Sequence, residues 1–201
     1  MVLRGKFIVI EGPDGAGKTT QSKLLSQFLH SKGIKYLYTR EPGGTKTGDK
    51  IRDILLNPES KISNMAECLL YASARAQLVN EIIQPALNEG TWVIADRYLH
   101  SSIVYQGMGL DLGIDIVEDI NKIATTGLMP DVTFLIDLDT NTSLGRINRS
   151  KDRIESRGEV YFRKVREGYL NLAEKYGMIK IDGNKSVEEI SLELIKNIPL
   201  K

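Results

Sequence analysis

One short stretch, EGPDGAGKTT, constrains the fold of this chain more than any other, because residues 12–19 match the phosphate-binding pattern G-x-x-x-x-G-K-[ST]. The apolar run before it is typical of a β-strand, and the residues from Lys18 onward are typical of a helix. Glycines in such a loop let backbone N–H groups converge on an anion, and the helix N-terminus adds the positive end of its dipole. This context predicts a binding site for a nucleoside triphosphate.

Two side chains of the loop have expected roles toward that nucleotide. Lys18 is expected to reach the outer phosphates, and the Thr19 hydroxyl is expected to bind Mg²⁺. Asp14 is the unusual member, because it places a carboxylate inside a site for a polyanion. The pattern alone does not separate a kinase from a GTPase or an ATPase motor. The nucleotide-binding residues expected from the loop are Gly12, Pro13, Asp14, Gly15, Ala16, Gly17, Lys18, Thr19 and Thr20.

Short apolar runs alternate with longer helical patterns along the chain. Because the runs are short and rich in Val, Ile, Phe and Tyr, strands are predicted at 6–11, 35–40, 91–96, 132–138 and 178–182. Helices are predicted at about 18–31, 45–56, 65–89, 113–126, 140–149, 159–176 and 186–197. This alternation predicts an α/β fold with a parallel sheet between two layers of helices. With no linker or repeat in view, residues 1–201 are predicted to form a single domain.

Composition excludes several classes of protein. The net charge of +1 offers no basic field for a nucleic-acid partner, and no apolar run reaches the length of a membrane-spanning helix. The N-terminal apolar run is too short for a signal peptide, so we expect a cytoplasmic protein with no membrane partner. Cys68, the one cysteine, rules out an internal disulfide and is expected to be buried. His30 and His100 lack metal-ligand spacing.

A second group of charged residues follows the strand expected at 91–96. Asp96 and Arg97 stand just past it, at the strand end where ligands bind in open parallel sheets. Asp96 is placed like the metal-supporting acid of other P-loop enzymes, and the planar fork of Arg97 is suited to bridging two phosphates. A salt bridge at the end of a strand is the alternative for this pair. The basic segment 146–159 has a solvated helix end as its alternative.

Taken together, these motifs resemble the thymidylate kinase family. EGPDGAGKTT, REPGGT, LLYASARAQL, WVIADRY, SSIVYQGMG and DRIE occur in the order and spacing of that family, over most of the chain. The resemblance implies a three-layer P-loop NTPase fold with a five-stranded parallel sheet and a mobile lid. It implies a nucleoside-monophosphate kinase that transfers the γ-phosphoryl group of ATP to dTMP with Mg²⁺, in dTTP biosynthesis, and that forms a homodimer. The implied regions are a phosphate loop at 12–19, a monophosphate-binding region at about 40–75 and a lid at about 146–158.

The resemblance also implies which residues bind the acceptor. Arg52 and Arg97 should contact the dTMP phosphate, Arg75 should reach the thymine edge, and Tyr71 should stack on the base. Asp14 should face the acceptor sugar and orient a phosphate-binding arginine. The alternatives are a core aromatic for Tyr71 and a turn-forming role for Asp14. The other residues expected around the base and sugar are Ser101, Ser102, Tyr105 and Gln106, with helix capping as the alternative for the serines.

On the donor side, Arg146 is implied to stack on adenine, and the loop at 182–186, with Lys185, is implied to close over the base. The resemblance also implies a cis peptide at Pro42.

The lid is expected to supply a catalytic arginine, because Gly15 leaves the phosphate loop without one. Arg153 is the first choice and Arg149 the second. Lys18, Asp14 and Arg97 complete the expected catalytic set, and Thr19 and Asp96 are the expected Mg²⁺ ligands. Positive charge is needed because both substrates are anionic.

Two other functions stay open from the residues alone. One is a monophosphate kinase of broader acceptor range, because a single methyl group separates dTMP from dUMP and is worth only about 1–3 kcal/mol. The other is a P-loop regulatory NTPase. It is disfavoured because the chain offers no guanine-reading Asn-Lys-x-Asp: in GNKS the acid is replaced by Val187.

Overall fold

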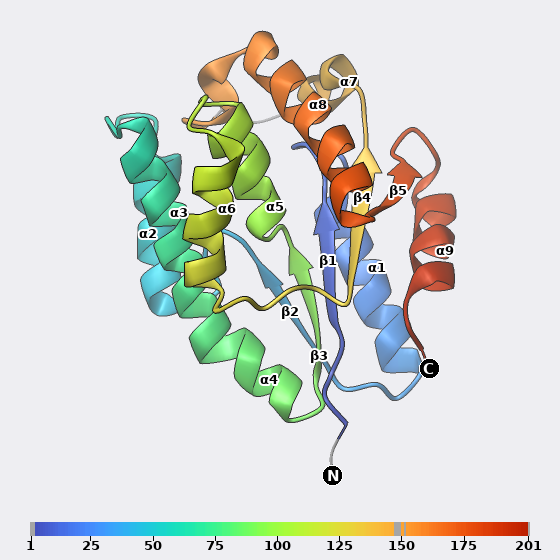
Figure 1. Cartoon of the computed structure of the whole chain (residues 1–201). Coiled ribbons are helices and arrows are strands. Elements are labelled where there is room, and N and C mark those ends of the chain that lie inside the picture. Colours follow the sequence, from blue (N-terminus) through green and yellow to red (C-terminus); the bar gives the residue numbers. More distant parts are fainter. Residues whose placement is uncertain (1–2, 147–149, 151, 201) are drawn as a thin grey trace.

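A parallel sheet of five strands organises the part of the chain that the structure describes, residues 3–146, 150 and 152–200 of a computed structural model. The strand order is β2-β3-β1-β4-β5, and each neighbouring pair is parallel. Figure 1 shows the strands rising in one direction, so their carboxyl ends share the upper edge. The strands are β1 (Phe7–Glu11), β2 (Tyr36–Arg40), β3 (Trp92–Asp96), β4 (Val132–Asp137) and β5 (Ile179–Asp182). All five predicted strands are confirmed, to within one residue at each end.

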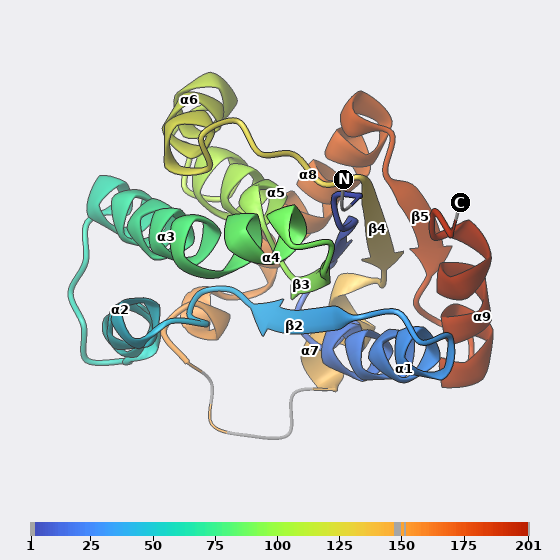
Figure 2. The same ribbon diagram turned by 90° about the horizontal axis from the view of Figure 1, so that it is seen from below.

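Each face of the sheet is covered by its own core, as expected for a continuous apolar strand. Phe7 and Val9 of β1 point into one cluster, whereas Ile8 and Ile10 point into the other, and all four are fully buried. The second cluster packs under α1 (Lys18–Ser31) and α9 (Val187–Asn197). The first packs under the helices of the opposite face, which Figure 2 shows across the sheet from α1 and α9. The three-layer α/β fold is therefore confirmed.

The helices of the first face run from the middle to the end of the chain. The helix expected at 65–89 is one continuous run: α3 (Asn64–Leu78), a π-helical segment η1 (Val79–Ile83) and α4 (Gln84–Asn88). The π segment precedes Pro85, which has no N–H for the regular helical bond. Cys68 is buried on this run, as expected. The other helices are α2 (Lys46–Leu56), α6 (Ile114–Ala124), α7 (Thr140–Gly145), a 3₁₀ turn η3 (Glu155–Arg157) and α8 (Glu159–Tyr176).

The helices of the structure differ from the predicted ones at two places. The helix expected at 140–149 ends at Gly145 in α7, and residues 147–149 lie outside the described residues. The expected helices also omit residues 99–108, and this omission is wrong. There α5 (Leu99–Ser102) continues into a π-helical segment, η2 (Ile103–Met108). Serines, β-branched residues and glycine are weak helix formers, but burial of Ile103 and Val104 in the core overrides that local preference.

Close packing between α8 and η2 generates the first prediction. A β-carbon added at Gly168 would lie 2.6 Å from Val104 Cγ1 and 2.8 Å from Met108 Sδ. Gly168→Ala should therefore lower the free energy of unfolding by about 1–3 kcal/mol through overpacking, although alanine is the better helix former. Chemical denaturation measures this difference. Gly145→Ala is the control, because its added carbon meets no atom of the described residues within 4 Å. Equal stability of the two variants would contradict the prediction.

Candidate active site

The phosphate loop joins β1 to α1 at the carboxyl edge of the sheet. Gly12, Gly15 and Gly17 have φ of 146°, 80° and 88°, which L side chains rarely adopt. A side chain at Gly12 would also press against the Ile136 carbonyl, with the added carbon 2.5 Å from its oxygen. The sequence therefore needs glycine at these turns. Lys18 lies across the loop, and its Nζ donates to the Pro13 carbonyl at 2.7 Å.

A first cavity, called here the loop cavity, opens over this loop. The Thr19 hydroxyl donates to Asp96 Oδ2 at 2.7 Å, so the two expected Mg²⁺ ligands lie together at its floor. A hydroxyl and a carboxylate are hard oxygen donors, and Mg²⁺ in phosphotransferases takes few protein ligands beside phosphates and water. The residue set therefore fits Mg²⁺. The lining residues are Asp14, Gly15, Gly17, Lys18, Thr19, Thr20, Arg40, Glu41, Arg52, Asp96, Arg97 and Arg146.

A second cavity, called here the tyrosine cavity, is enclosed by α2, α3 and the η2 segment. It contains every residue that was expected to bind the acceptor. It shares Asp14, Glu41, Arg52 and Arg97 with the loop cavity, so the two spaces meet at these four side chains. The lining residues are Asp14, Glu41, Pro42, Arg52, Leu56, Tyr71, Arg75, Arg97, Ser101, Ser102, Tyr105, Gln106, Asp152 and Ile154.

Arg97 and Asp14 form an ion pair where the two cavities meet. Arg97 Nη2 donates to Asp14 Oδ1 at 2.7 Å, and Tyr105 donates its hydroxyl to Asp14 Oδ2 at 3.1 Å. Arg97 Nη1 also donates to the Gly12 carbonyl at 3.0 Å and to the Tyr169 hydroxyl at 3.0 Å. The carboxylate inside the phosphate loop thus turns away from the loop backbone and holds an arginine.

The backbone at Arg97 is strained. Its φ is 75°, in the left-handed region that a long side chain seldom occupies. The strain is held by Glu11 at the end of β1, which accepts from the Tyr98 N–H at 2.9 Å and from the Ser101 hydroxyl at 2.6 Å. A buried acid therefore fixes the turn that aims Arg97.

Burial and charge shift the pKa values of the loop residues. Burial works to raise the pKa of Asp14, but the charges of Arg97 and Lys18 outweigh it and lower that pKa to about 2. Burial, reinforced by the charge of Arg97, lowers the pKa of Lys18 to about 8. Asp14 is thus ionised throughout the physiological range, whereas Lys18 in the free protein titrates close to it.

Arg75 lies in the wall of the tyrosine cavity and is almost fully buried. Its Nη2 lies 2.6 Å from Glu41 Oε2, and its Nη1 donates to Ser102 Oγ at 2.9 Å and to Asn121 Oδ1. Burial raises the pKa of Glu41 although Arg75 opposes that shift. The second Glu41 oxygen and Arg75 Nε are buried without a hydrogen-bond partner among the described residues. Both residues line the tyrosine cavity.

Some of the expected residues do not line either cavity, and one lies outside the described residues. Arg153 binds Glu67 and the Leu55 carbonyl, and it is not among the described residues that line either space. Arg149 lies outside the described residues. Lys185 pairs with Glu193 of α9 instead of facing the loop cavity. Arg146 does line the loop cavity, with its Nη1 3.5 Å from the Gly15 carbonyl oxygen.

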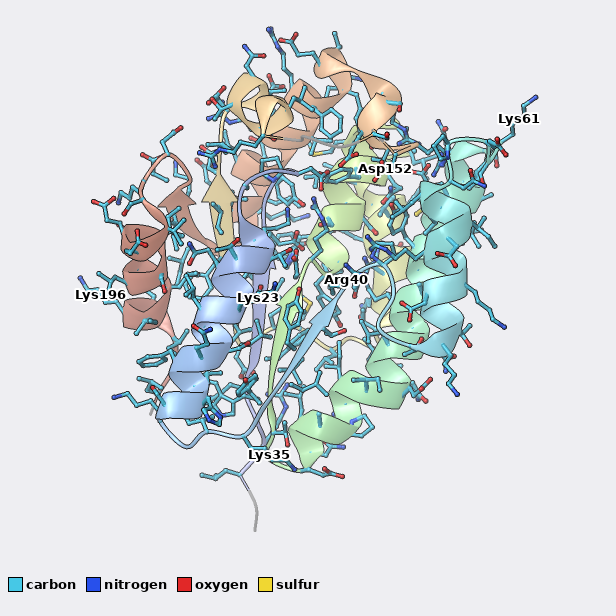
Figure 3. The ribbon with its side chains drawn as sticks, turned by 180° about the vertical axis from the view of Figure 1, so that it is seen from behind. Lys23, Lys35, Arg40, Lys61, Asp152 and Lys196 are labelled. Atoms are coloured by element: carbon cyan, nitrogen blue, oxygen red, sulfur yellow. The ribbon has the colours of Figure 1, made fainter. Side chains whose placement is uncertain are left out.

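Other lining residues were missed by the sequence reasoning. Arg40 and Glu41 stand in REPGG, a motif of the resemblance in which neither residue was given a role; the Glu41–Pro42 peptide is cis, as the resemblance implied. Asp152 and Ile154 stand in DRIE, which was searched only for an arginine. Figure 3 shows Arg40 at the upper end of β2 with Asp152 above it. Arg40, Glu41 and Asp152 are charged residues within motifs that were already recognised, and that charge was the signal that could have identified them as site residues.

The fold and the site together define a class of protein. A phosphate loop whose cavity meets a second cavity lined by arginines and tyrosines, at the carboxyl edge of a parallel sheet, is the arrangement of a P-loop nucleotide kinase. A model of the thymidylate kinase family matches residues 10–194. The chain belongs to the thymidylate kinase family, and it is a nucleoside-monophosphate kinase.

Individual relatives agree with the family match. The chain is 46% identical to the thymidylate kinase of Thermoanaerobacter sp. (strain X514), over 96% of this chain and 97% of the relative. It is 47% identical to that of Caldanaerobacter subterraneus subsp. tengcongensis, over 98% and 96%. It is 45% identical to that of Exiguobacterium sibiricum, over 98% and 95%. Among the described residues, no helix has the length and apolarity needed to span a membrane.

The lowered pKa of Lys18 generates the second prediction. Polyphosphate brings negative charge to the ammonium group and raises its pKa again, so binding at pH 8 should take up a proton. Calorimetric titration with ATP in buffers of different ionisation enthalpy measures that uptake, expected at up to about half a proton per site. Lys18→Arg is the matched control, because a guanidinium stays charged at this pH. A binding enthalpy independent of buffer in the unaltered protein would contradict the prediction.

Proposed function

We propose that this protein transfers the γ-phosphoryl group of ATP to dTMP, giving dTDP and ADP. The observation that carries the proposal is the junction of the two cavities at Asp14, Glu41, Arg52 and Arg97. A donor on the phosphate loop and an acceptor in the tyrosine cavity would meet there. The names of the relatives support thymidine monophosphate as the acceptor.

The loop cavity supplies the donor side of this proposal. Lys18 and the backbone N–H groups of the loop would hold the outer phosphates, and Thr19 with Asp96 would hold Mg²⁺. Mg²⁺, when bound, neutralises charge on the transferring phosphoryl oxygens. Arg146, beside Gly15, is placed to contact the donor.

The tyrosine cavity supplies the acceptor side. Arg52, whose Nη1 donates to the Pro42 carbonyl at 2.8 Å, and Arg97 are proposed to hold the acceptor phosphate. Tyr71 is proposed to stack on the base, with Arg75 at its polar edge. Ser101, Ser102, Tyr105 and Gln106 complete the wall around the base and sugar, and Tyr105 narrows the space beside the sugar.

No strong general base is needed, because the attacking oxygen belongs to an anionic phosphate. The chain must instead align two anions and screen their repulsion. Arg97 borders both cavities and is proposed to contact both phosphate groups. Asp14 fixes the orientation of the Arg97 guanidinium by accepting a hydrogen bond from it. A lid arginine, Arg149 or Arg153, remains the sequence-based candidate for further screening.

We also propose that the enzyme is a homodimer. Leu69 of α3 and Ile116 and Ile123 of α6 are exposed, and the two helices pack side by side. Such apolar side chains on adjacent helices suit a second copy of the chain.

An acceptor panel tests the proposed function. ADP formation should require a monophosphate, and dTMP should be the best of dTMP, dUMP, dCMP, dGMP and thymidine. Activity on dUMP should persist at about 10- to 200-fold lower kcat/KM, because the difference is one methyl group. A coupled assay of ADP release measures each acceptor with ATP and Mg²⁺. Absence of dTMP-dependent ADP release would end the proposal.

Asp14 gives a second test at the junction. Asp14→Ala removes the partner of Arg97 Nη2 and of the Tyr105 hydroxyl, so both lose their fixed position. The kcat/KM for dTMP should fall by at least about tenfold, while the Kd for ATP stays within about threefold, because loss of one member of this partly buried ion pair leaves the other without its fixed partner. Steady-state kinetics and calorimetry separate the two effects. A variant that loses ATP binding alone would show that Asp14 serves the donor side.

A further inference from the structure

A buried carboxylate outside both cavities links the lid to the base end of the tyrosine cavity. Glu67 of α3 is 0% exposed, and one of its oxygens, Oε1, accepts from Gln106 Nε2 at 2.9 Å. The other oxygen, Oε2, accepts from Arg153 Nη2 at 2.6 Å and from Arg157 Nη2. Gln106 lines the cavity, whereas Glu67 and the two arginines stand behind it.

This arrangement fixes the orientation of the Gln106 amide. An ionised carboxylate has only acceptor atoms, so the amide must turn its N–H₂ group toward Glu67. The amide oxygen Oε1 then has no hydrogen-bond partner among the described residues and is available to a ligand. Rotating the amide by half a turn would set its oxygen against the carboxylate and lose the bond.

The fixed amide distinguishes the two kinds of pyrimidine edge. Thymine presents an N3–H donor beside the O4 acceptor, whereas cytosine presents an N3 acceptor beside the N4 amino donor. An outward-facing amide oxygen can accept from N3–H, but it meets a lone pair on N3 of cytosine. A protein whose amide could rotate would accept both edges.

Arg153 and Arg157 hold the Glu67 carboxylate in place. Arg153 is anchored by its Nε, which donates to the Leu55 carbonyl at 2.7 Å, and Arg157 by its Nη1, which donates to the Tyr161 hydroxyl at 2.9 Å. Both are mostly buried, with side-chain exposures of 11% and 17%. Their positive charges compensate the buried carboxylate, which would be costly alone.

From this geometry we infer that Glu67, held by Arg153 and Arg157, is a positioning residue that sets the Gln106 amide and thereby selects an acceptor base with an N–H donor at its pairing edge. The inference rests on the proposed function, because it assumes that a nucleobase occupies the tyrosine cavity. It gives Arg153 a role different from the one expected from the motif DRIE: support of acceptor recognition through Glu67 instead of contact with the transferring phosphate.

Glu67→Gln is the direct test, because it keeps the shape but lets the facing amide adopt either orientation. The ratio of kcat/KM for dTMP to that for dCMP should fall by at least about tenfold, with the KM for ATP within about twofold of the unaltered enzyme. Calorimetric binding of dTMP and dCMP gives the same comparison without turnover. An unchanged ratio in a folded Glu67→Gln protein would overturn the inference.

Arg153 gives an independent test should Glu67→Gln fail to fold. Arg153→Ala should raise the KM for dTMP and lower the dTMP-to-dCMP ratio, with a smaller effect on kcat, and Arg153→Lys should restore part of the ratio because it returns the charge. Arg163→Ala is the matched control, since the one ion pair of Arg163 within the described part of the chain is with Glu159, on the exposed side of α8. A fall in kcat with unchanged dTMP KM and unchanged ratio would place Arg153 on the transferring phosphate and overturn the inference.

The two proposals fail in distinguishable ways. If the unaltered protein releases no ADP with dTMP, the proposed function fails, and the binding titrations alone decide the role of Glu67. The unaltered protein could instead be active on dTMP while the Glu67 and Arg153 variants keep its dTMP-to-dCMP ratio of kcat/KM. In that case only the inference about Glu67 fails.

Discussion

The ion pair between Arg97 and Asp14 is the contact around which the rest of the site is arranged. It lies where the two cavities meet, and each partner comes from a different sheet strand: Asp14 from the loop after β1 and Arg97 from the end of β3. The pairing of β1 with β3 in the sheet brings them within 2.7 Å. The strained φ of Arg97 is the local cost of this placement, and the hydrogen bonds to Glu11 offset it. A carboxylate of the phosphate loop thus holds a cation at the junction of the two cavities.

A common pattern recurs at three positions. Each important arginine stands in front of a buried acid: Glu11 supports the turn at Arg97, Glu41 pairs with Arg75, and Glu67 pairs with Arg153. Burial raises the pKa of Glu11 and of Glu41, and the charges of Arg97 and Arg75, respectively, oppose that rise. Clustered arginines repel one another, and a ligand-free site rich in them needs internal anions. The acids therefore hold these arginines in place through contacts within the protein itself.

Local pattern predicted the fold well, because each strand is a short apolar run and the phosphate loop has an unmistakable spacing. It failed at η2, where the stabilising contacts of Ile103 and Val104 come from α6 and α8, and no local signal reports such packing. The candidate site likewise contains residues that local motifs predicted and residues that only tertiary contacts reveal. Arg52, Tyr71 and Gln106 were found because motifs carry them, and the structure brings them to one cavity. Glu41 and Glu67 were missed as functional candidates, because only tertiary contact distinguishes a buried acid behind an arginine from a surface acid on a helix.

The order of the strands has a consequence for synthesis of the chain. β1, which carries the phosphate loop, has no partner in its neighbourhood along the sequence: Phe7 pairs with Val93, and Ile8 with Val132. As the polypeptide leaves the ribosome, the apolar segment from Phe7 to Ile10 must wait with its backbone unpaired until the middle of the chain has emerged. An apolar segment with an unpaired backbone is prone to pair with another unfolded chain during that time. This delay in strand pairing arises because the phosphate loop follows the central strand, whose partners β3 and β4 come much later in the chain.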